Sequence, residues 1–349
     1  MDANVTAHIR AHLLEISQGQ WRVLKLRAIH SGHVARVFRA HVHERGVEAP
    51  FTVFIKIQSL SGALDRQFQS YSREWQFYKS VRQQVLVRTP EAFFLDDAPE
   101  TAGGILVLED LSTNFDRGAY REMGPPVESQ IQSDQDPSQT QSATRQRDYP
   151  LTIHRAAMAS LAALHASPIS PSKIPFRFED NVRQLGPING DEHQLMRETL
   201  GSDTADLFVS LGEEIAVEQG DLEPNHLGLI HCDARLGNIL PQLGCPIVDW
   251  GYYCWGPAAY DLAFYFSAEQ LDLNRIGECL TYYLTERQRL LSPYCKLSMD
   301  RLMADVRSFL PLVARTPTLL LAQPISATQA HYWRSMLHRT AVLWKALSS

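Results

Sequence analysis

Short apolar segments separated by turn-forming residues make up most of the first part of the chain. Five of them have the length and side-chain composition of β-strands. They are residues 22–28, 37–42, 51–57, 90–95 and 104–108. Residues 65–82 differ, because their large aromatic side chains recur at the three- to four-residue spacing of a helix. The pattern predicts a small antiparallel sheet with one helix.

The pattern becomes helical after residue 150. Apolar and small side chains recur every three or four positions from Ile153 to Leu164, and Ser167-Pro168 follows as a stop signal. From residue 261 onward we expect further helical segments, interrupted at four prolines. These prolines are Pro293, Pro311, Pro317 and Pro324. A mixed N-terminal part followed by a mainly helical part predicts an α+β fold.

A change in composition marks the start of the helical part. Gln, Ser, Asp, Thr and Pro dominate residues 125–147, which hold almost no large apolar side chains. Such a segment buries too little surface to offset its ordering entropy, which predicts a flexible insert at about residues 122–148. A functional lid is the alternative. We expect an N-lobe over residues 1–110 and a helical C-lobe, including the insert, over residues 111–349.

Composition and charge exclude several classes of protein. Of 349 residues, 44% are hydrophobic and 21% are charged, as in soluble globular proteins. The formal net charge of −6 argues against broad nucleic-acid binding, which needs clustered Lys and Arg. No run approaches the roughly 18 apolar residues of a membrane span, and the first residues lack an export-signal pattern. The five cysteines form no Cys-x-x-Cys pair, so we expect free thiols in the cytoplasm. No pattern indicates an oligomeric state.

One stretch of the helical part carries an ordered set of polar residues. Residues 230–240 place Asp233 and Asn238 between apolar ends, and Asp249 ends an apolar segment eleven residues beyond Asn238. Phosphoryl transfer from a nucleotide needs such a set. One carboxylate orients the acceptor hydroxyl, while an amide oxygen and a second carboxylate hold Mg²⁺. The alternative is that Asp233 and Asn238 form a turn and Asp249 caps a helix. The complete ordered set favours phosphoryl transfer.

These motifs resemble the catalytic loop and the metal-binding aspartate of the aminoglycoside phosphotransferase and choline kinase superfamily. The resemblance implies a bilobal protein-kinase-like fold with a small antiparallel-sheet N-lobe. It also implies that Asp233 is the catalytic base or acceptor-orienting acid, and that Asn238 and Asp249 bind magnesium. Arg235 stands where protein kinases place a phosphate-contacting lysine, and solvation at the surface is the alternative for this arginine. Glycine is common in the superfamily where this chain has Cys232.

Two charged residues of the N-lobe fit the same family. Lys56 interrupts the apolar run of residues 51–57, and Glu74 lies eighteen residues later in the aromatic segment. They look like the family's strand lysine and helix glutamate, a pair whose lysine contacts the α- and β-phosphates of ATP. The alternatives are an edge-strand lysine that reaches solvent and an exposed helical glutamate.

The other parts of a nucleotide site resemble the family less specifically. Residues 105–111 are similar to the strand and hinge that join the lobes. The resemblance implies that the backbone from Glu109 to Leu111 bonds the adenine edge. Ser31 and Gly32 offer a phosphate-covering loop with a single glycine, whose backbone N–H groups would face the phosphates.

Two structural assignments complete the resemblance. Asp261 lies in a segment similar to the one after the family's metal-binding aspartate, and we expect it to cap a helix and brace the catalytic loop. His165, in the helical segment after residue 150, is expected to be structural. The Glu-Asp-Leu hinge and residues 73–78 favour the ecdysteroid-kinase-like and choline-kinase-like branch of the superfamily.

Together these residues predict an ATP-dependent phosphotransferase that moves the γ-phosphate of Mg-ATP to a hydroxyl of a small molecule. A protein kinase and a nucleotide-binding scaffold without catalysis are the alternatives. The short segment between Asp249 and Asp261 argues against a protein kinase, because a typical activation segment is longer. The presence of every catalytic residue type argues against a scaffold. An aminoglycoside, a choline-like cation, a sugar and a steroid alcohol all remain candidate acceptors.

Overall fold

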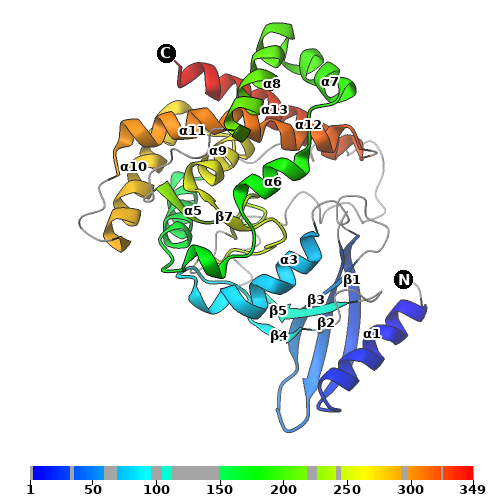
Figure 1. Ribbon diagram of the computed structural model, residues 1–349. Helices are drawn as coiled ribbons and strands as arrows, with labels where there is room; N and C mark the ends of the chain where they lie inside the picture. Colours follow the sequence, from blue (N-terminus) through cyan, green and yellow to red (C-terminus); the bar gives the residue numbers. More distant parts are fainter. Residues whose placement is uncertain are drawn as a thin grey trace. The chain divides into compact units, whose positions relative to one another are not determined.

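The structure is a computed structural model that describes most of the chain (Figure 1). It covers residues 3–31, 35–58, 69–95, 104–111, 149–217, 226–240, 245–291, 297–323 and 325–348. Gly32 and the predicted insert at about residues 122–148 lie outside these ranges. Of the helices that are described, none is both long enough and apolar enough to cross a membrane.

The chain divides into two compact units. The first consists of Met1–Gln83, Thr89–Pro137 and Asp249–Gly251. The second consists of Gln84–Arg88, Ser138–Val248 and Tyr252–Ser349. The chain therefore leaves the second unit after Val248, contributes three residues to the first, and returns at Tyr252. The predicted lobe boundary at residue 110 stays a prediction.

The first unit is built on a five-stranded antiparallel sheet with the strand order β1-β2-β3-β5-β4. Its strands are β1 (Trp21–Ser31), β2 (Ala35–Glu44), β3 (Phe51–Gln58), β4 (Ala92–Leu95) and β5 (Ile105–Glu109). All five predicted strands are confirmed. In the register, Lys56 of β3 lies opposite Val37 of β2 and Leu106 of β5. Lys56 therefore stands on the central strand, and the edge-strand alternative is wrong.

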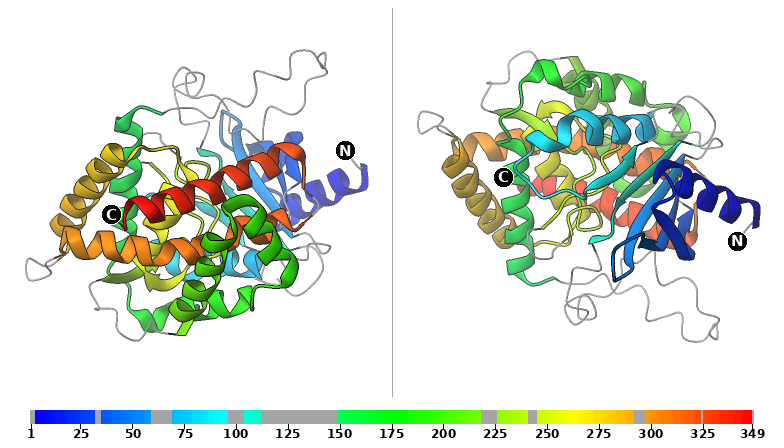
Figure 2. Two further views of the ribbon diagram at one scale, coloured as in Figure 1. Left: turned by 90° about the horizontal axis from the view of Figure 1, so that it is seen from above. Right: turned by 90° about the horizontal axis from the view of Figure 1, so that it is seen from below.

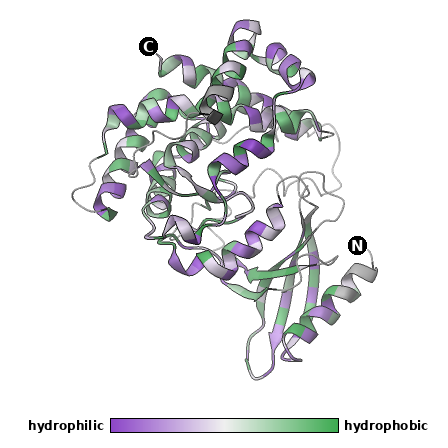
Figure 3. Cartoon of the chain, in the orientation of Figure 1, coloured by the Kyte–Doolittle hydropathy of each residue, from purple (hydrophilic) through white to green (hydrophobic). Residues whose placement is uncertain are grey.

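Side chains alternate between the two faces of this sheet, and helix α1 (Ala3–Ile16) packs against it (Figure 2). Along β2, Phe38, Ala40 and Val42 are buried and the residues between them are more exposed, in step with the alternating hydropathy in Figure 3. Ile9 and Leu13 of α1 belong to the same buried cluster. The sequence pattern did not predict α1, because only a narrow apolar stripe marks this helix. The first unit thus contains α1 in addition to the one helix that the sequence predicted.

The aromatic segment of the first unit is helical, as predicted, but its pitch changes along its length. Helix α3 (Ser70–Gln76) continues as a π-helical turn (Phe77–Val81) and a 3₁₀ turn (Arg82–Gln84). Residues 65–68 of the predicted helix lie outside the described ranges. The side chains at the recurring positions are buried, and Glu74 is buried with them. These residues are Tyr71, Glu74, Trp75 and Tyr78.

The second unit is mainly helical, and the fold as a whole is α+β, both as predicted. Its helices are α5 (Leu151–His165), α6 (Phe178–Leu185), α7 (Gly190–Leu200), α8 (Ser202–Val217), α9 (Ala258–Ala268), α10 (Leu273–Leu290), α11 (Met299–Val313), α12 (Arg315–Leu321) and α13 (Ala327–Ala346). Strands β6 (Leu227–Ile230) and β7 (Cys254–Pro257) form a two-stranded antiparallel ladder. Every residue of α9 is buried, so this helix forms the centre of the unit. The stripe predicted after residue 150 lies on α5, where only Ile153 and Ala156 are half-buried rather than buried.

Two of the four prolines expected to interrupt helices lie inside them. Pro311 stands in the last turn of α11, two residues before its end. Pro317 stands in the first turn of α12, where backbone N–H groups have no intrahelical acceptor, so a proline there removes no hydrogen bond. The expected breaks at Pro311 and Pro317 are therefore wrong. Pro293 and Pro324 lie outside the described residues.

Candidate active site

A lysine and two carboxylates form a charge cluster in the first unit. The ammonium of Lys56, on β3, lies 2.8 and 2.9 Å from the two carboxylate oxygens of Glu74, on α3. Oδ1 of Asp249 lies 2.9 Å from the same ammonium. The ion pair predicted between Lys56 and Glu74 is formed, and the predicted metal-binding aspartate joins it.

Burial and charge together set the pKa values in this cluster. The side chains of Lys56 and Glu74 are 16% and 5% exposed, whereas that of Asp249 is 51% exposed. Burial acts to lower the pKa of Lys56, but Asp249 and Glu74 outweigh it and raise this pKa above its ordinary value. Burial raises the pKa of Glu74 because it disfavours the charged carboxylate; Lys56 opposes this rise and the Asp249 carboxylate adds to it. When all three groups are ionised, the two carboxylates outnumber the one ammonium.

The Asp-Trp-Gly segment that carries Asp249 is anchored within the first unit. Trp250 stacks on Phe77 with a centroid distance of 3.8 Å and an interplanar angle of 6°. A Cβ atom at Gly251 would lie 2.9 Å from Cβ of Ser70, so only glycine permits this approach. Asp249 has a φ of 67°, a left-handed conformation that aspartate tolerates better than most residues. No helix begins at Asp249, so the capping alternative is wrong.

In the second unit, the residues predicted as the catalytic loop follow β6. Nδ2 of Asn238 donates to the backbone carbonyl of Asp233 at 2.9 Å and to its Oδ2 at 2.7 Å. Nε of Arg235 donates to Oδ1 of Asp233 at 3.2 Å. Two different side chains therefore hold the two oxygens of the Asp233 carboxylate, which fixes its orientation. The Arg235 side chain is only 22% exposed, so the alternative of a solvated surface arginine is wrong.

The loop also closes as a turn, as the alternative interpretation of Asp233 and Asn238 expected. The backbone N–H of Asn238 donates to the carbonyl of Arg235 at 2.8 Å, and the N–H of Val248 donates to the carbonyl of Asn238 at 2.9 Å. A Cβ atom at Gly237 would lie 2.7 Å from Nη1 of Arg235. Glycine at this position thus lets the guanidinium fold back over the loop and reach Asp233.

A buried carboxylate holds the start of the loop. Asp261 of α9 accepts the backbone N–H of His231 at 2.7 Å and that of Cys232 at 2.8 Å. The predicted brace is confirmed. The predicted capping role is wrong, because α9 begins at Ala258 with Pro257 as its N-cap, and Asp261 lies inside the first turn.

The backbone at Cys232, where the resemblance leads us to expect glycine, has a conformation that favours glycine. Its φ is 65°, in the left-handed region that favours glycine. Its thiol lies 3.4 Å from that of Cys254 and 3.6 Å from Nδ2 of Asn181, which also donates to the Tyr252 carbonyl at 2.9 Å. Burial raises the pKa of the Cys232 thiol. The four cysteines that are described are free thiols, as predicted, and Cys295 lies outside the described residues.

Sequence reasoning missed two side chains that contact the loop. Oε1 of Glu269, at the end of α9, accepts the backbone N–H of Leu236 at 2.9 Å. Asn181, on α6, contacts Cys232 as described above. Each is more than thirty positions from its partner, and neither lies in a motif, so no local signal marks it. Only the tertiary packing of α6 and α9 brings these two side chains to the loop.

The predicted hinge lies at the end of β5 in the first unit. The backbone N–H of Glu109 donates to the carbonyl of Glu91 at 2.7 Å. Asp110 is buried and pairs with Nε of Arg39 at 2.8 Å, an ion pair that no motif predicted. Leu111 is 4% exposed. Ser31 is the last residue of β1, and the neighbouring Gly32 lies outside the described residues.

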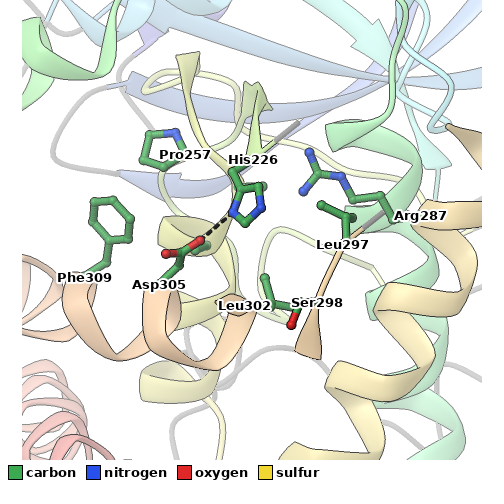
Figure 4. Close-up of a pocket in the computed structure, with 10 residues that line it drawn as sticks. His226, Pro257, Arg287, Leu297, Ser298, Leu302, Asp305 and Phe309 are labelled. Atoms are coloured by element: carbon green, nitrogen blue, oxygen red, sulfur yellow. Dashed lines mark hydrogen bonds and ion pairs between the residues drawn. The ribbon is translucent and has the colours of Figure 1, made fainter. Parts of the chain in front are cut away.

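A pocket in the second unit lies apart from these predicted residues (Figure 4). Its polar lining includes Arg287 and the hydrogen-bonded pair of His226 and Asp305, and none of the predicted site residues lines it. Within the described ranges, no group of three or more His, Cys, Asp or Glu side chains is arranged to hold a metal ion. The magnesium ligands Asn238 and Asp249 therefore stay a prediction.

A comparison with known protein families matches the part of the chain that holds the candidate site. A family model described as the phosphotransferase enzyme family matches residues 25–291. The matched range is more than half of the chain and includes every predicted site residue. A search of curated proteins finds no relative of significant similarity.

Solved structures share the fold over nearly the full length. A choline kinase from Cryptosporidium parvum Iowa II is 12% identical with a TM-score of 0.58, covering 99% of this chain and 96% of that chain. Choline kinase LicA from Streptococcus pneumoniae, solved in complex with AMP, is 12% identical with a TM-score of 0.51, covering 97% and 98%. A thermostable mutant of aminoglycoside phosphotransferase APH(4)-Ia, in its apo form, is 13% identical with a TM-score of 0.52, covering 97% and 98%. The predicted kinase-like fold is confirmed.

Proposed function

The chain belongs to the phosphotransferase enzyme family, and we propose that it transfers the γ-phosphate of Mg-ATP to a hydroxyl of a small molecule. The observation that carries this proposal is the Asp233 carboxylate, whose two oxygens are held by Asn238 and Arg235. A carboxylate fixed in this way keeps lone pairs for a further hydrogen-bond donor. Asp233 would accept the acceptor O–H, orient its oxygen toward the γ-phosphate, and take up the proton.

The cluster in the first unit supports a role in binding the nucleotide. Lys56 is held by Glu74 on a central strand, and its raised pKa keeps the ammonium charged at neutral pH. Such an ammonium would donate to the α- and β-phosphate oxygens, while Glu74 fixes its position. Because LicA has this fold and was solved with AMP, an adenine nucleotide is the expected phosphate donor. The backbone from Glu109 to Leu111 would then bond the adenine edge, with Glu109 contributing its carbonyl because its N–H donates to the Glu91 carbonyl.

The residues proposed as magnesium ligands have suitable chemistry. Both described hydrogen bonds of the Asn238 side chain use Nδ2, which turns the amide oxygen away from Asp233. Asp249 presents a carboxylate that is half-exposed on an anchored backbone. Amide and carboxylate oxygens are the ligands that Mg²⁺ prefers. When bound, the ion would neutralise charge on the phosphates during transfer. In that role Asn238 both orients Asp233 and contributes a ligand.

A small-molecule acceptor fits the structure better than a protein does. The residues between Asp249 and Asp261 form a turn, β7 and the first turn of α9, and this short connection has no counterpart of an activation segment. We also propose a cytoplasmic location, which the free thiols support. The assignment to the ecdysteroid-kinase-like branch stays a prediction.

The proposal is tested by assaying ADP release from Mg-ATP with a panel of hydroxyl compounds. The panel contains aminoglycosides, choline, ethanolamine, sugars and steroid alcohols, with a generic protein substrate as the test of the alternative. We expect one class of small molecule to stimulate ADP release, with the phosphorylated product identified by mass spectrometry. GTP is assayed in parallel as a donor.

Nucleotide binding is measured separately by calorimetry, so that a missing acceptor is not mistaken for a missing activity. Mg-ATP binding without turnover on any compound would favour the scaffold alternative. Absence of nucleotide binding, or phosphorylation of the protein substrate alone, would contradict the proposed function.

A further inference from the structure

A continuous path of buried hydrogen bonds runs from α10 to Asp261 within the second unit. Nη1 of Arg287 donates to the hydroxyl of Tyr283 at 2.9 Å. That hydroxyl lies 2.8 Å from Nδ1 of His165, at the end of α5. Nε2 of His165 lies 3.1 Å from Oδ2 of Asp261. Since Asp261 accepts the backbone N–H groups of His231 and Cys232, the path ends one residue before Asp233.

The direction of each hydrogen bond in this path is determined by its two ends. A guanidinium only donates, so the Tyr283 hydroxyl accepts from Arg287 and has its own proton left for His165. Burial lowers the pKa of His165, which favours the neutral ring with one N–H. Nδ1 then accepts from Tyr283, and the N–H at Nε2 donates to Asp261. All donors point toward Asp261, so each bond polarises the next.

The path is closed to solvent along its whole length. Arg287 and His165 are 1% and 3% exposed, and Asp261 is fully buried, as is Tyr283. Bulk water therefore has little access to replace a missing link, and the groups on either side of a gap would be left unsatisfied. A path of this kind holds its members in one arrangement.

The same residues also hold the strand that leads into the loop. Nη2 of Arg287 donates to the carbonyl of Leu227, the first residue of β6, at 3.3 Å. A Cβ atom at Gly228 would lie 2.6 Å from the carbonyl oxygen of His165, so β6 lies directly against the end of α5. Strand β6 is thus attached at its start to Arg287 and just beyond its end to Asp261.

We propose that Tyr283 and Arg287 are positioning residues for the catalytic loop. They act through His165 and Asp261 on the backbone of His231 and Cys232, and thereby set the position of the following residue, Asp233. The effect on turnover rests on the proposed phosphotransfer function, whereas the effect on the loop backbone does not. Neither residue is close to Asp233 in the sequence.

The outer end of the path reaches the pocket described above. Figure 4 shows Arg287 at this pocket together with the pair formed by His226 and Asp305. The pocket wall and the loop are thus linked by side chains alone, over three helices of the second unit. Substitution of Arg287 therefore tests the path from the end farthest from Asp261.

The chain offers a closely matched control for the central link. Tyr265 is fully buried, and its hydroxyl lies 2.8 Å from Nδ1 of His154, the distance found between Tyr283 and His165. Tyr283→Phe and Tyr265→Phe remove the same kind of hydrogen bond from the same kind of environment. Only the first bond lies on the path that ends at Asp261.

The experiment measures amide hydrogen exchange in a peptide spanning residues 227–238 of the full-length protein and its two variants. We expect exchange in this peptide to become about tenfold faster in Tyr283→Phe and to stay at the wild-type rate in Tyr265→Phe. In the phosphotransfer assay, kcat should fall about tenfold in Tyr283→Phe with the KM for ATP unchanged. Thermal unfolding of both variants checks that they are comparably stable.

Equal exchange in the two variants, whether slow or fast, would overturn the proposal, because the path to Asp261 would then have no special effect. If Tyr283→Phe does not fold, Arg287→Gln replaces it and is expected to accelerate exchange in the same peptide; unchanged exchange there would equally overturn the proposal. A wild-type protein without phosphotransfer would contradict the proposed function, and the exchange result would still decide the role of the path.

Discussion

The charge cluster of the first unit and the loop of the second hold their key carboxylates by different means. Asp249 is half-exposed and pairs with one ammonium, which Glu74 shares. Asp233 is held by an amide and a guanidinium, on a backbone that buried Asp261 fixes. The first arrangement has an excess of negative charge and suits the arrival of a further cation. In the second, each oxygen of the Asp233 carboxylate accepts from a different side chain, which suits the fixing of a geometry.

This difference predicts which property a substitution changes in the charge cluster and which it changes in the loop. Removing a charge from the charge cluster changes its electrostatic balance. The free energy of unfolding and the affinity for a charged ligand should therefore fall. Removing a side chain from the loop changes the direction in which an oxygen of Asp233 points. The rate of a reaction that depends on this orientation should therefore fall. Substitutions in the two units therefore separate binding from turnover.

The largest effect is expected from Asp233→Asn. The amide keeps the size of the side chain but provides no carboxylate to take a proton from the acceptor. We expect kcat to fall about a thousandfold while the dissociation constant of Mg-ATP stays within twofold of wild type. ADP-release kinetics and calorimetry measure the two quantities.

Asp206→Asn is the control for this substitution. Asp206 also pairs with an arginine, Arg197, but lies on α8 and is 48% exposed. The control should retain wild-type turnover. Near-wild-type kcat in Asp233→Asn would show that the reactive carboxylate lies elsewhere, and the contrast between the two units would lose its basis.

Lys56→Met tests the opposite side of the comparison. It leaves Glu74, whose side chain is 5% exposed, without its ammonium. We expect the free energy of unfolding to fall by about 3 kcal/mol, because a buried carboxylate loses its partner. Mg-ATP affinity should fall as well. Urea unfolding and calorimetry measure the two losses.

The double variant Lys56→Met/Glu74→Leu separates these two effects. It removes the unpaired carboxylate, so most of the stability should return while nucleotide affinity stays low. Recovery of both quantities would mean that Lys56 has no direct contact with the nucleotide.

Asp249→Asn should have a small effect on stability and a specific effect on metal dependence. Because its side chain is 51% exposed, loss of the pair with Lys56 should change the free energy of unfolding by at most about 1 kcal/mol. Calorimetry with and without Mg²⁺ should show that the metal no longer strengthens nucleotide binding. An unchanged Mg²⁺ dependence would place the metal ligands elsewhere and leave the first cluster a structural feature.

The sequence predicted the parts of the fold and site that depend on local spacing. The five strands follow from short apolar runs, and the pairing of Lys56 with Glu74 follows from a cation within such a run and an acid on the next helix. Asp233 and Asn238 lie five residues apart, so one turn brings them together. In these cases the residues that interact are the same residues whose spacing in the sequence predicted the contact.

The parts that the sequence did not predict depend on contacts between distant segments. Tyr283 meets His165 over 118 positions, and Glu269 meets Leu236 over 33. Neither tyrosine nor glutamate stands out from its own helix, because its role arises only when that helix packs beside β6 and the loop. The sequence shows a cysteine at position 232, where the resemblance leads us to expect glycine. It does not reveal that the backbone of Cys232 is left-handed.

The last expected effect concerns pH and again separates the two units. In the first, charged groups face one another, whereas in the second His165 is buried as a neutral ring. Burial lowers the pKa of His165 below its ordinary value of 6.5. In the unfolded chain the same ring takes up a proton near that ordinary value. Below about pH 6.5 the unfolded state therefore binds more protons than the folded state.

It follows that the free energy of unfolding should fall as the pH drops below about 6.5, by at most about 1.4 kcal/mol per pH unit from this residue. Above pH 6.5 both states carry a neutral ring, so His165 adds no pH dependence there. Urea unfolding between about pH 5 and 8 measures the slope in the wild type and in His165→Gln. Other histidines and the carboxylates contribute equally to both proteins, so the difference between the slopes belongs to His165. Parallel curves below pH 6.5 would mean that His165 titrates normally in the folded protein, and the path from Arg287 to Asp261 would then carry a charged ring below that pH.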